Sequence, residues 1–396
     1  MPKGINKMTT TNLAQRTGNL RPSLIRDIAE EGMTMEGVLP LWFGEGTWPS
    51  PDHIVSSAQS ALATGAHFYQ PNSGNMALRG AVCAYTTALY GGPCPRERIT
   101  VTASGMQGIA LTAQALISPG DRVVTLQPAW PNIAEAFRIS GAELDFVALE
   151  AKDGRWSLDM DRFLAALTPQ TKAVLINSPH NPTGWAMPQS DLQLLLEHCR
   201  LHGIWIVSDD VYARLYRADT VAPSLVSIAA LEDRVVSINS FSEAWSMTGW
   251  RLGWINAPAE LGPVFAMLTE FNIAGPAGFV QAAGVTALSD GERDINDLKS
   301  KLASSYAVMV AALERIDGIT FLQPDGAFYC FFRVDGMQGS LSTARHLLRH
   351  AKLGVAPGIA FGDAGEGFLR LCYAQPADRI EDAVDRLARG LPRAIQ

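Results

Sequence analysis

A turn of small residues and a distant arginine could together bind an anion. Residues 104–106 (Ser-Gly-Met) follow a run predicted to be a strand, 99–102, and precede an apolar helical pattern. Backbone N–H groups at the start of a helix and the helix dipole favour a bound anion. Further along the chain, Ser240 offers a hydroxyl, and Arg251 a planar guanidinium that suits phosphate oxygens. Taken singly, the turn is more often an ordinary strand-to-helix connection, and Arg251 could form a surface ion pair.

Polar and aromatic residues that could hold a ring-shaped ligand follow the next predicted strands. Asp209 and Tyr212 lie just after the run 204–208, at the strand end where open α/β sheets place their ligands. Asn181 stands in an Asn-Pro-Thr-Gly segment, and Trp130 follows another strand candidate. Each also has a simpler interpretation: a helix cap for Asp209, a turn residue for Asn181 and a core aromatic for Trp130.

The elements that must position these residues alternate between strands and helices, which predicts an α/β fold with a mostly parallel sheet. The helix candidate 190–202 lies between two of the strands. Apolar runs without strict alternation favour strands covered by helices on both faces. The predicted strands are 99–102, 122–126, 172–176, 204–208 and 235–239. An amphipathic pattern over 294–316 leads to a smaller α+β unit with strands at 326–332 and 367–371.

Composition excludes several classes of function. The chain has 396 residues and a net charge of −7, from 39 acidic against 32 basic side chains. A mildly acidic protein without a long basic run is a poor candidate for binding nucleic acid or an anionic membrane. No apolar stretch is long enough to span a bilayer, and the polar N-terminus has no signal-like core. The five scattered cysteines indicate free thiols. We therefore expect a cytoplasmic protein.

The segment 240–253, Ser-Phe-Ser-Glu-Ala-Trp-Ser-Met-Thr-Gly-Trp-Arg-Leu-Gly, resembles the active-site signature of the class I/II aminotransferases. These are fold-type I enzymes that use pyridoxal 5′-phosphate (PLP). Asn177 begins a segment that matches the family's N-x-P-x-N-P-T-G loop, and the resemblance covers roughly residues 40 to 375. In the family, the residue before Ala244 is the lysine that holds PLP as a Schiff base. Here it is Glu243, and a carboxylate cannot form an imine with an aldehyde.

The resemblance implies a role for each candidate residue. Asp209 would pair with the pyridine nitrogen, Tyr212 and Asn181 would bind the phenolic oxygen, and Trp130 would stack on the ring. Arg370 would grip the substrate α-carboxylate, with a backbone donor from Gly44, although the family usually has proline where Gly46 stands. Tyr69 would reach the cofactor phosphate of a second subunit, which implies a homodimer with composite sites. The phosphate itself would be held by Ser104, Gly105, Met106, Ser240 and Arg251.

The same resemblance implies a division of the chain into three parts. Residues 1–45 would pack on the small domain, 46–290 would form the large PLP-binding domain, and 291–396 the C-terminal small domain. A dinucleotide-binding enzyme is disfavoured, because no G-x-G-x-x-G follows a strand. A DNA-binding regulator with an aminotransferase-like domain is also disfavoured, because no N-terminal helix-turn-helix unit is expected.

Three hypotheses about function follow from Glu243. The protein could be an aminotransferase that binds PLP or pyridoxamine 5′-phosphate (PMP) non-covalently, with an α-amino acid and a 2-oxo acid as substrates, and transaminates poorly. It could instead be a lysine-less enzyme that depends on PMP, whose amine would pair with the Glu243 carboxylate. It could also be a non-catalytic descendant. The expected catalytic residues are Glu243, Tyr212 and Asp209, with burial raising the pKa of Glu243 enough for proton transfer.

Overall fold

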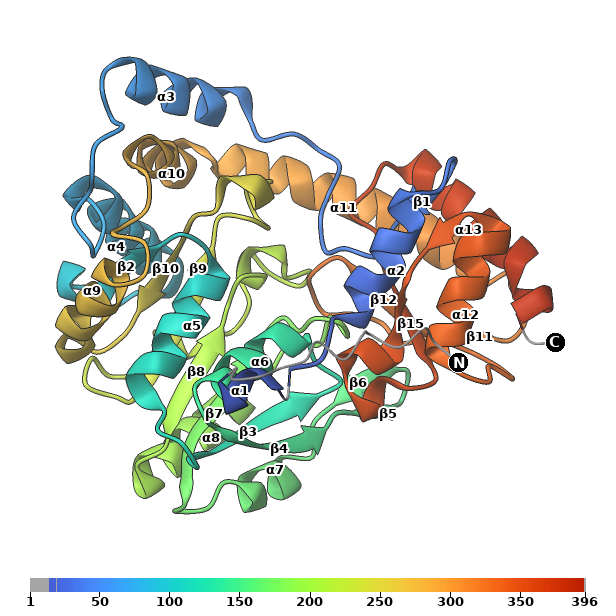
Figure 1. Cartoon of the computed structure of the whole chain (residues 1–396), viewed down its shortest axis with the longest axis horizontal. Helices are drawn as coiled ribbons and strands as arrows, with labels where there is room; N and C mark the ends of the chain where they lie inside the picture. The colour runs from blue at the N-terminus through green and yellow to red at the C-terminus, as the bar shows by residue number, and fades with distance from the viewer. Residues whose placement is uncertain (1–13, 19, 395–396) are drawn as a thin grey trace.

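A computed structural model describes residues 14–18 and 20–394, and its largest sheet has seven strands. This sheet lies at the centre of the larger part of the molecule (Figure 1). The strand order is β2-β10-β9-β8-β7-β3-β4. The strands from β9 to β4 run parallel, whereas β10 is antiparallel to both of its neighbours. The strands are β2 (Ile99–Thr102), β3 (Arg122–Gln127), β4 (Glu143–Ala148), β7 (Thr171–Asn177), β8 (Trp205–Asp209), β9 (Val235–Ser240) and β10 (Gly253–Asn256). The predicted α/β fold with a mostly parallel sheet is confirmed, and each strand predicted for it matches within a residue or two.

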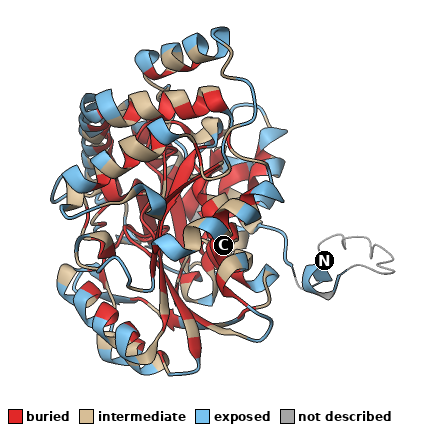
Figure 2. Ribbon diagram, turned by 90° about the vertical axis from the view of Figure 1, so that its left-hand side faces the viewer, coloured by how far each residue is buried: buried red, intermediate tan, exposed pale blue. Residues whose placement is uncertain are grey.

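The apolar strands are buried on both faces, which explains why their sequences lack strict alternation. Val123 packs in one hydrophobic cluster and its neighbour Val124 in another, and Leu175 and Ile176 divide in the same way. Figure 2 shows the buried strands lying between partly exposed helices. The helices of this part are α3 (Asp52–Ala63), α4 (Met76–Tyr90), α5 (Gly105–Leu116), α6 (Pro131–Ile139), α7 (Met160–Ala166), α8 (Gln189–His202), α9 (Gly262–Glu270) and α10 (Gly278–Asp290).

A second, antiparallel sheet is built from the C-terminal part of the chain. Its order is β11-β12-β15-β14, formed by β11 (Ile319–Phe321), β12 (Tyr329–Val334), β14 (Ala356–Pro357) and β15 (Phe368–Cys372). The long helix α11 (Glu292–Leu313) joins the two parts, as the amphipathic pattern predicted, and packs against α13 (Ala377–Ala394) (Figure 1).

The N-terminal segment is attached to this second sheet region. Strand β1 (Leu39–Pro40) pairs in parallel with β13 (Leu353–Gly354). Helix α2 (Leu24–Met33) contacts β13, β14 and α12 (Ser340–His346). The chain then passes toward the large sheet through residues 41–50, so this segment can contribute to a site between the two sheets. The exact boundaries of the domains stay a prediction.

None of the helices among the described residues is both long and apolar enough to cross a bilayer. All five cysteines are free thiols.

Candidate active site

A cavity of about 460 Å³ lies at the carboxyl ends of the parallel strands. Strands β7, β8 and β9 end there at Asn177, Asp209 and Ser240, and the second sheet adds side chains from β12 and β15. Every predicted site residue except Ser104 and Tyr69 lines it. Those residues are Gly44, Gly105, Met106, Trp130, Asn181, Asp209, Tyr212, Ser240, Glu243, Arg251 and Arg370. Sequence positions as far apart as 44 and 370 are therefore brought together.

One end of the cavity has the features expected of an anion site. Helix α5 begins at Gly105, and the Ser104 hydroxyl caps it. A Cβ at Gly105 would lie 3.3 Å from the Val211 side chain and 3.5 Å from that of Ser240, so a larger residue would crowd this part of the cavity wall. Arg251 adopts a left-handed backbone conformation with φ of 56°. Its Nη1 donates to the Thr248 carbonyl and, at 3.5 Å, to the Ser242 hydroxyl, and the side chain lines the cavity.

The middle of the cavity is organised around Asn177, which links two predicted ligand-binding residues. Its side-chain amide donates to the Asp209 carbonyl at 3.0 Å, and its side-chain oxygen accepts from the Asn181 N–H at 2.8 Å. The Asn181 carbonyl in turn accepts from the backbone N–H of Trp130 at 2.9 Å. Burial, and then the nearby Glu243 carboxylate, raise the pKa of Asp209. A cation beside Asp209 would stabilise its ionised carboxylate and oppose this rise in its pKa.

Tyr212 is held by a second tyrosine that sequence reasoning missed. The hydroxyls of Tyr212 and Tyr329 are hydrogen-bonded at 2.6 Å, and the Asn181 amide donates to Tyr329 at 3.4 Å. Burial raises the pKa of both phenols, so both stay protonated near neutral pH. Gly44 must be a glycine, because a Cβ there would lie 1.9 Å from the Tyr329 hydroxyl oxygen. In the sequence, Tyr329 belongs to a predicted strand, and nothing in its pattern marks it as a site residue.

Arg370 is a buried cation that keeps unused hydrogen-bond donors. The side chain is 2% exposed. Its Nη1 donates to Asn181 Oδ1 at 2.9 Å and its Nη2 to the Trp42 carbonyl. Its Nε has no hydrogen-bond partner, and no carboxylate among the described residues pairs with the guanidinium. Because a buried charge without a counterion is costly, this group is arranged for an anionic ligand.

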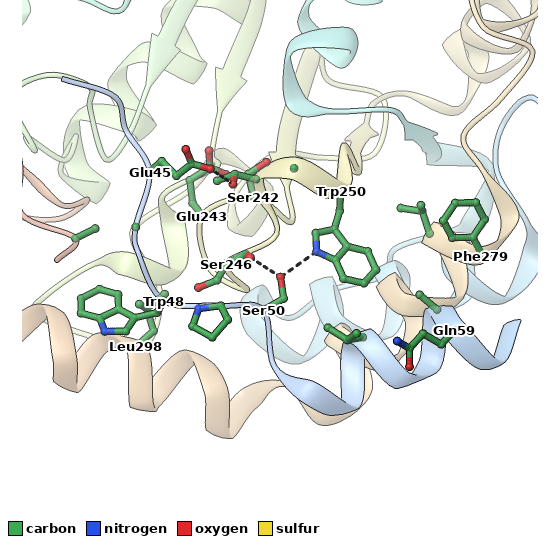
Figure 3. Close-up of a pocket in the computed structure, with 18 of the residues that line it drawn as sticks. Glu45, Trp48, Ser50, Gln59, Ser242, Glu243, Ser246, Trp250, Phe279 and Leu298 are labelled. Carbon is green, nitrogen blue, oxygen red and sulfur yellow. Dashed lines mark hydrogen bonds between the residues drawn. The ribbon is translucent and has the colours of Figure 1, made fainter. Parts of the chain in front are cut away.

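Glu243 stands between this cavity and a larger one. The second cavity, of about 710 Å³, is lined by Trp48, Trp250 and other apolar side chains, with Glu243 at its inner wall (Figure 3). The Glu243 side chain is only partly buried, but its Oε2 atom is out of contact with water and has no partner. Burial raises the pKa of Glu243 to about 7, although Ser240 and Arg251 oppose the shift.

The wall of the larger cavity is fixed by a short hydrogen-bond chain. Ser50 donates to the Ser246 carbonyl at 2.6 Å and accepts from the Trp250 indole at 2.9 Å (Figure 3). Tyr69 borders neither cavity, since its side chain is 91% exposed on the outside of the molecule. Of the two predicted site residues that do not line the 460 Å³ cavity, Ser104 is buried beside it at the start of α5, whereas Tyr69 lies on the outer surface.

Comparison with known proteins explains this arrangement. Residues 41–387 match the family model for aminotransferase class I and II. The chain belongs to that family. The aspartate aminotransferase of Pyrococcus horikoshii is 30% identical over 96% of this chain and 97% of its own length. The aromatic-amino-acid aminotransferase 2 of Thermococcus litoralis is also 30% identical, over 96% of this chain and 98% of its own.

Solved structures agree with the family assignment. The Thermus thermophilus aspartate aminotransferase with maleate superposes with a TM-score of 0.89 at 29% identity, over 96% of this chain and 99% of that one. The aspartate aminotransferase from Rhizobium meliloti superposes with a TM-score of 0.90 at 28% identity, over 97% and 99%. The aminotransferase therefore has the aspartate aminotransferase-like fold of type I, as the sequence predicted, and is an enzyme by family.

Proposed function

We propose that this aminotransferase homologue binds PLP or PMP non-covalently in the 460 Å³ cavity and transaminates poorly. The observation that carries the proposal is the Glu243 carboxylate, whose unpartnered Oε2 faces a site in which the other expected groups converge. A carboxylate cannot attach the cofactor, whereas the surrounding residues keep the polar groups that would hold it.

The described residues fit the cofactor at each of its ends. The start of α5, with Ser104, Gly105, Met106, Ser240 and Arg251, would hold the phosphate. Asp209 would accept from the ring nitrogen, Tyr212 and Asn181 would bind the ring oxygen, and Trp130 would cover one face. When bound, the cofactor supplies a ring that draws electrons from a substrate amine carbon.

Substrate binding would centre on Arg370. Its free Nε and its planar fork suit the α-carboxylate of an amino acid or a 2-oxo acid. The backbone of Gly44, beside Tyr329, would add a donor. This geometry favours α-amino acid and 2-oxo acid substrates, and the names of the two relatives specify aspartate and aromatic amino acids for those proteins.

A lysine at this position would link the cofactor covalently and transfer a proton, and Glu243 can perform only the proton transfer. With a pKa of about 7, its carboxyl can accept or release a proton at Oε2 near neutral pH. It cannot form the covalent link. A specific observation favours PMP as the bound form: a cationic amine beside Oε2 would provide the partner that the carboxylate lacks. A PMP-dependent, lysine-less enzyme is therefore the second candidate.

The exposed apolar residues support a homodimer as the working unit. Phe68, Tyr69 and Phe271 are 74%, 91% and 88% exposed, which is unusual for side chains of this size in a monomer. A partner covering them would let Tyr69 approach the phosphate end of the other subunit. Sedimentation of the parent protein and of Tyr69→Ala, with cofactor retention measured on both, tests this arrangement. We also propose a cytoplasmic location.

The deciding experiment is cofactor retention. The purified protein is soaked with PLP or PMP, passed through gel filtration, and examined by absorption, then by intact mass after borohydride treatment. We expect retained cofactor without a covalent mass increase, and weaker retention in Arg251→Gln. Failure to retain either form would overturn the proposal and leave a fold without cofactor chemistry. A covalent adduct on the parent protein would show that another lysine has taken over.

A further inference from the structure

Two cysteines that take no part in the proposed cofactor site lie side by side near the end of helix α4. Cys83 is on the helix, and Cys94 follows the turn that ends it. Gly91 and Gly92 in this turn both have a φ of 71°, a left-handed conformation that favours glycine. The chain reverses there, and the two cysteine side chains pack against the same hydrophobic cluster.

The thiol groups of the two residues are in direct contact. The Cys94 thiol is hydrogen-bonded to the Cys83 sulfur and to the Thr86 hydroxyl. Cys83 and Thr86 are three residues apart on α4 and therefore share one face of the helix, so Cys94 lies over that face. Both cysteines of the pair are partly exposed, whereas the other three cysteines of the chain are buried. A reagent in solution can therefore reach this pair more readily than the other thiols.

The surroundings of the pair favour slow oxidation over rapid catalytic exchange. Burial raises the pKa of both thiols, and that of Cys94 rises to about 12. Because the thiolate is the attacking species, both sulfurs react slowly. Arg79 and Arg96 act against burial at Cys83 and favour its thiolate, so Cys83 is the sulfur that attacks an oxidant.

We infer that Cys83 and Cys94 form a reversible disulfide that joins α4 to the loop before β2, with a low-molecular-weight disulfide as the oxidant. The Cys83 thiolate attacks one sulfur of the oxidant and releases the other as a thiolate. The Cys94 thiolate then attacks Cys83 Sγ, breaks this mixed disulfide and releases the second small thiol. The protein loses two electrons and two protons, and the oxidant is reduced to two thiols. In the proposed cytoplasmic location, such a disulfide is transient.

The disulfide would reinforce a junction that leads to the cofactor cavity. Arg79 of α4 donates from Nε to the Ile99 carbonyl at 2.9 Å, and α4 packs on β2 (Figure 1). Strand β2 ends two residues before Ser104. The new bond closes a loop of 12 residues, from 83 to 94. We therefore expect the oxidised protein to have a thermal midpoint roughly 3 °C higher than the reduced protein.

Oxidation of the folded protein tests this assignment. The full chain is incubated with oxidised glutathione under native conditions, then denatured, alkylated and weighed as an intact protein. We expect three alkylated thiols instead of five, a peptide in which Cys83 is linked to Cys94, and five thiols again after dithiothreitol. Cys83→Ser and Cys94→Ser should each stop at a single glutathione adduct. Cys199→Ala is the control, because it removes a buried thiol and should form the same link as the parent.

Several results would overturn the inference. The parent could keep all five thiols, carry glutathione on both Cys83 and Cys94 without a link between them, or link a different pair. A thermal midpoint that falls on oxidation would also overturn it, because the fold would then have to distort to join the two sulfurs. The assay does not depend on cofactor binding, so each of these results leaves the proposed function unchanged.

Discussion

Replacing Glu243 by glutamine should stabilise the cofactor-free protein, and the gain should grow with pH. Burial raises the pKa of Glu243 from 4.5 to about 7. The folded protein therefore holds this proton more tightly than the unfolded chain does. The contribution of Glu243 to the free energy of unfolding falls as the pH rises from about 4.5 to about 7 and does not change further at higher pH. Glutamine keeps the shape of the side chain and removes the ionisation.

The magnitude follows from the shift. At about 1.36 kcal/mol per pKa unit, the ionised carboxylate lowers the free energy of unfolding by about 3 kcal/mol at about pH 8.5, and by about half of that at about pH 5.5. Because the side chain borders two cavities that water can enter, these are upper values. Denaturant unfolding of Glu243→Gln and of the parent, at both pH values and without cofactor, measures the difference.

A surface substitution separates this effect from a general change of net charge. Glu260 is exposed, so Glu260→Gln removes one negative charge without relieving a buried carboxylate. Its effect should be within about 0.5 kcal/mol at both pH values. If Glu243→Gln gave the same gain at pH 5.5 and pH 8.5, or destabilised the protein at both, the assignment of an ionisable, poorly solvated carboxylate at this position would be refuted.

Three further substitutions probe the rest of the site. Glu243→Lys should attach PLP covalently, seen as a borohydride-fixed mass increase, and purely non-covalent binding would show that position 243 has been misaligned with the family. Arg370→Gln should weaken binding of a 2-oxo acid by roughly 10- to 100-fold, measured by titration of the PMP-loaded protein; unchanged affinity would place the carboxylate elsewhere. Tyr329→Phe leaves the buried Tyr212 hydroxyl without its 2.6 Å partner and should cost about 1–3 kcal/mol of unfolding free energy; an effect below about 0.5 kcal/mol would show that Tyr212 finds another partner.

The fold could be predicted from the sequence because its main elements are governed by local patterns. Runs such as 172–176 and 235–239 are too apolar to lie on a surface, and their spacing leaves room for a helix between them. The sequence patterns did not predict two short strands. Strands β5 (Glu150–Lys152) and β6 (Arg155–Ser157) form a two-stranded ribbon, and their polar residues carry little of a strand pattern. They pair only with each other, across the turn at Asp153 and Gly154, so a local turn and not a hydrophobic pattern defines them.

The candidate site was predictable where a motif marks it and not where tertiary contacts make it. Asp209 and Arg251 stand in segments that match family motifs, and the fold brings both to one cavity. Tyr329 and Arg26 also line that cavity, but they stand on strand β12 and helix α2, which are far from the motifs in the sequence. Only folding brings them to the motif residues. Neither side chain has a local pattern that distinguishes a cavity residue from a core or surface residue.

The charges of the cavity favour a cationic ligand at position 243. Two carboxylates, Asp209 and Glu243, share the cavity, and the Glu243 carboxylate adds to the effect of burial in raising the pKa of Asp209. Arg251 is the one cation found to oppose the shift at Glu243. Relative to a lysine, glutamate at position 243 changes the local charge by two units, which Arg251 offsets only in part. A ligand that brings a protonated amine to Glu243 and a protonated ring nitrogen to Asp209 would pair with both carboxylates.

The parent protein should therefore retain PMP more tightly than PLP. In Glu243→Gln, the difference in retention between PMP and PLP should be smaller. A parent protein that prefers PLP, measured by competitive retention of the two forms on gel filtration, would contradict this account.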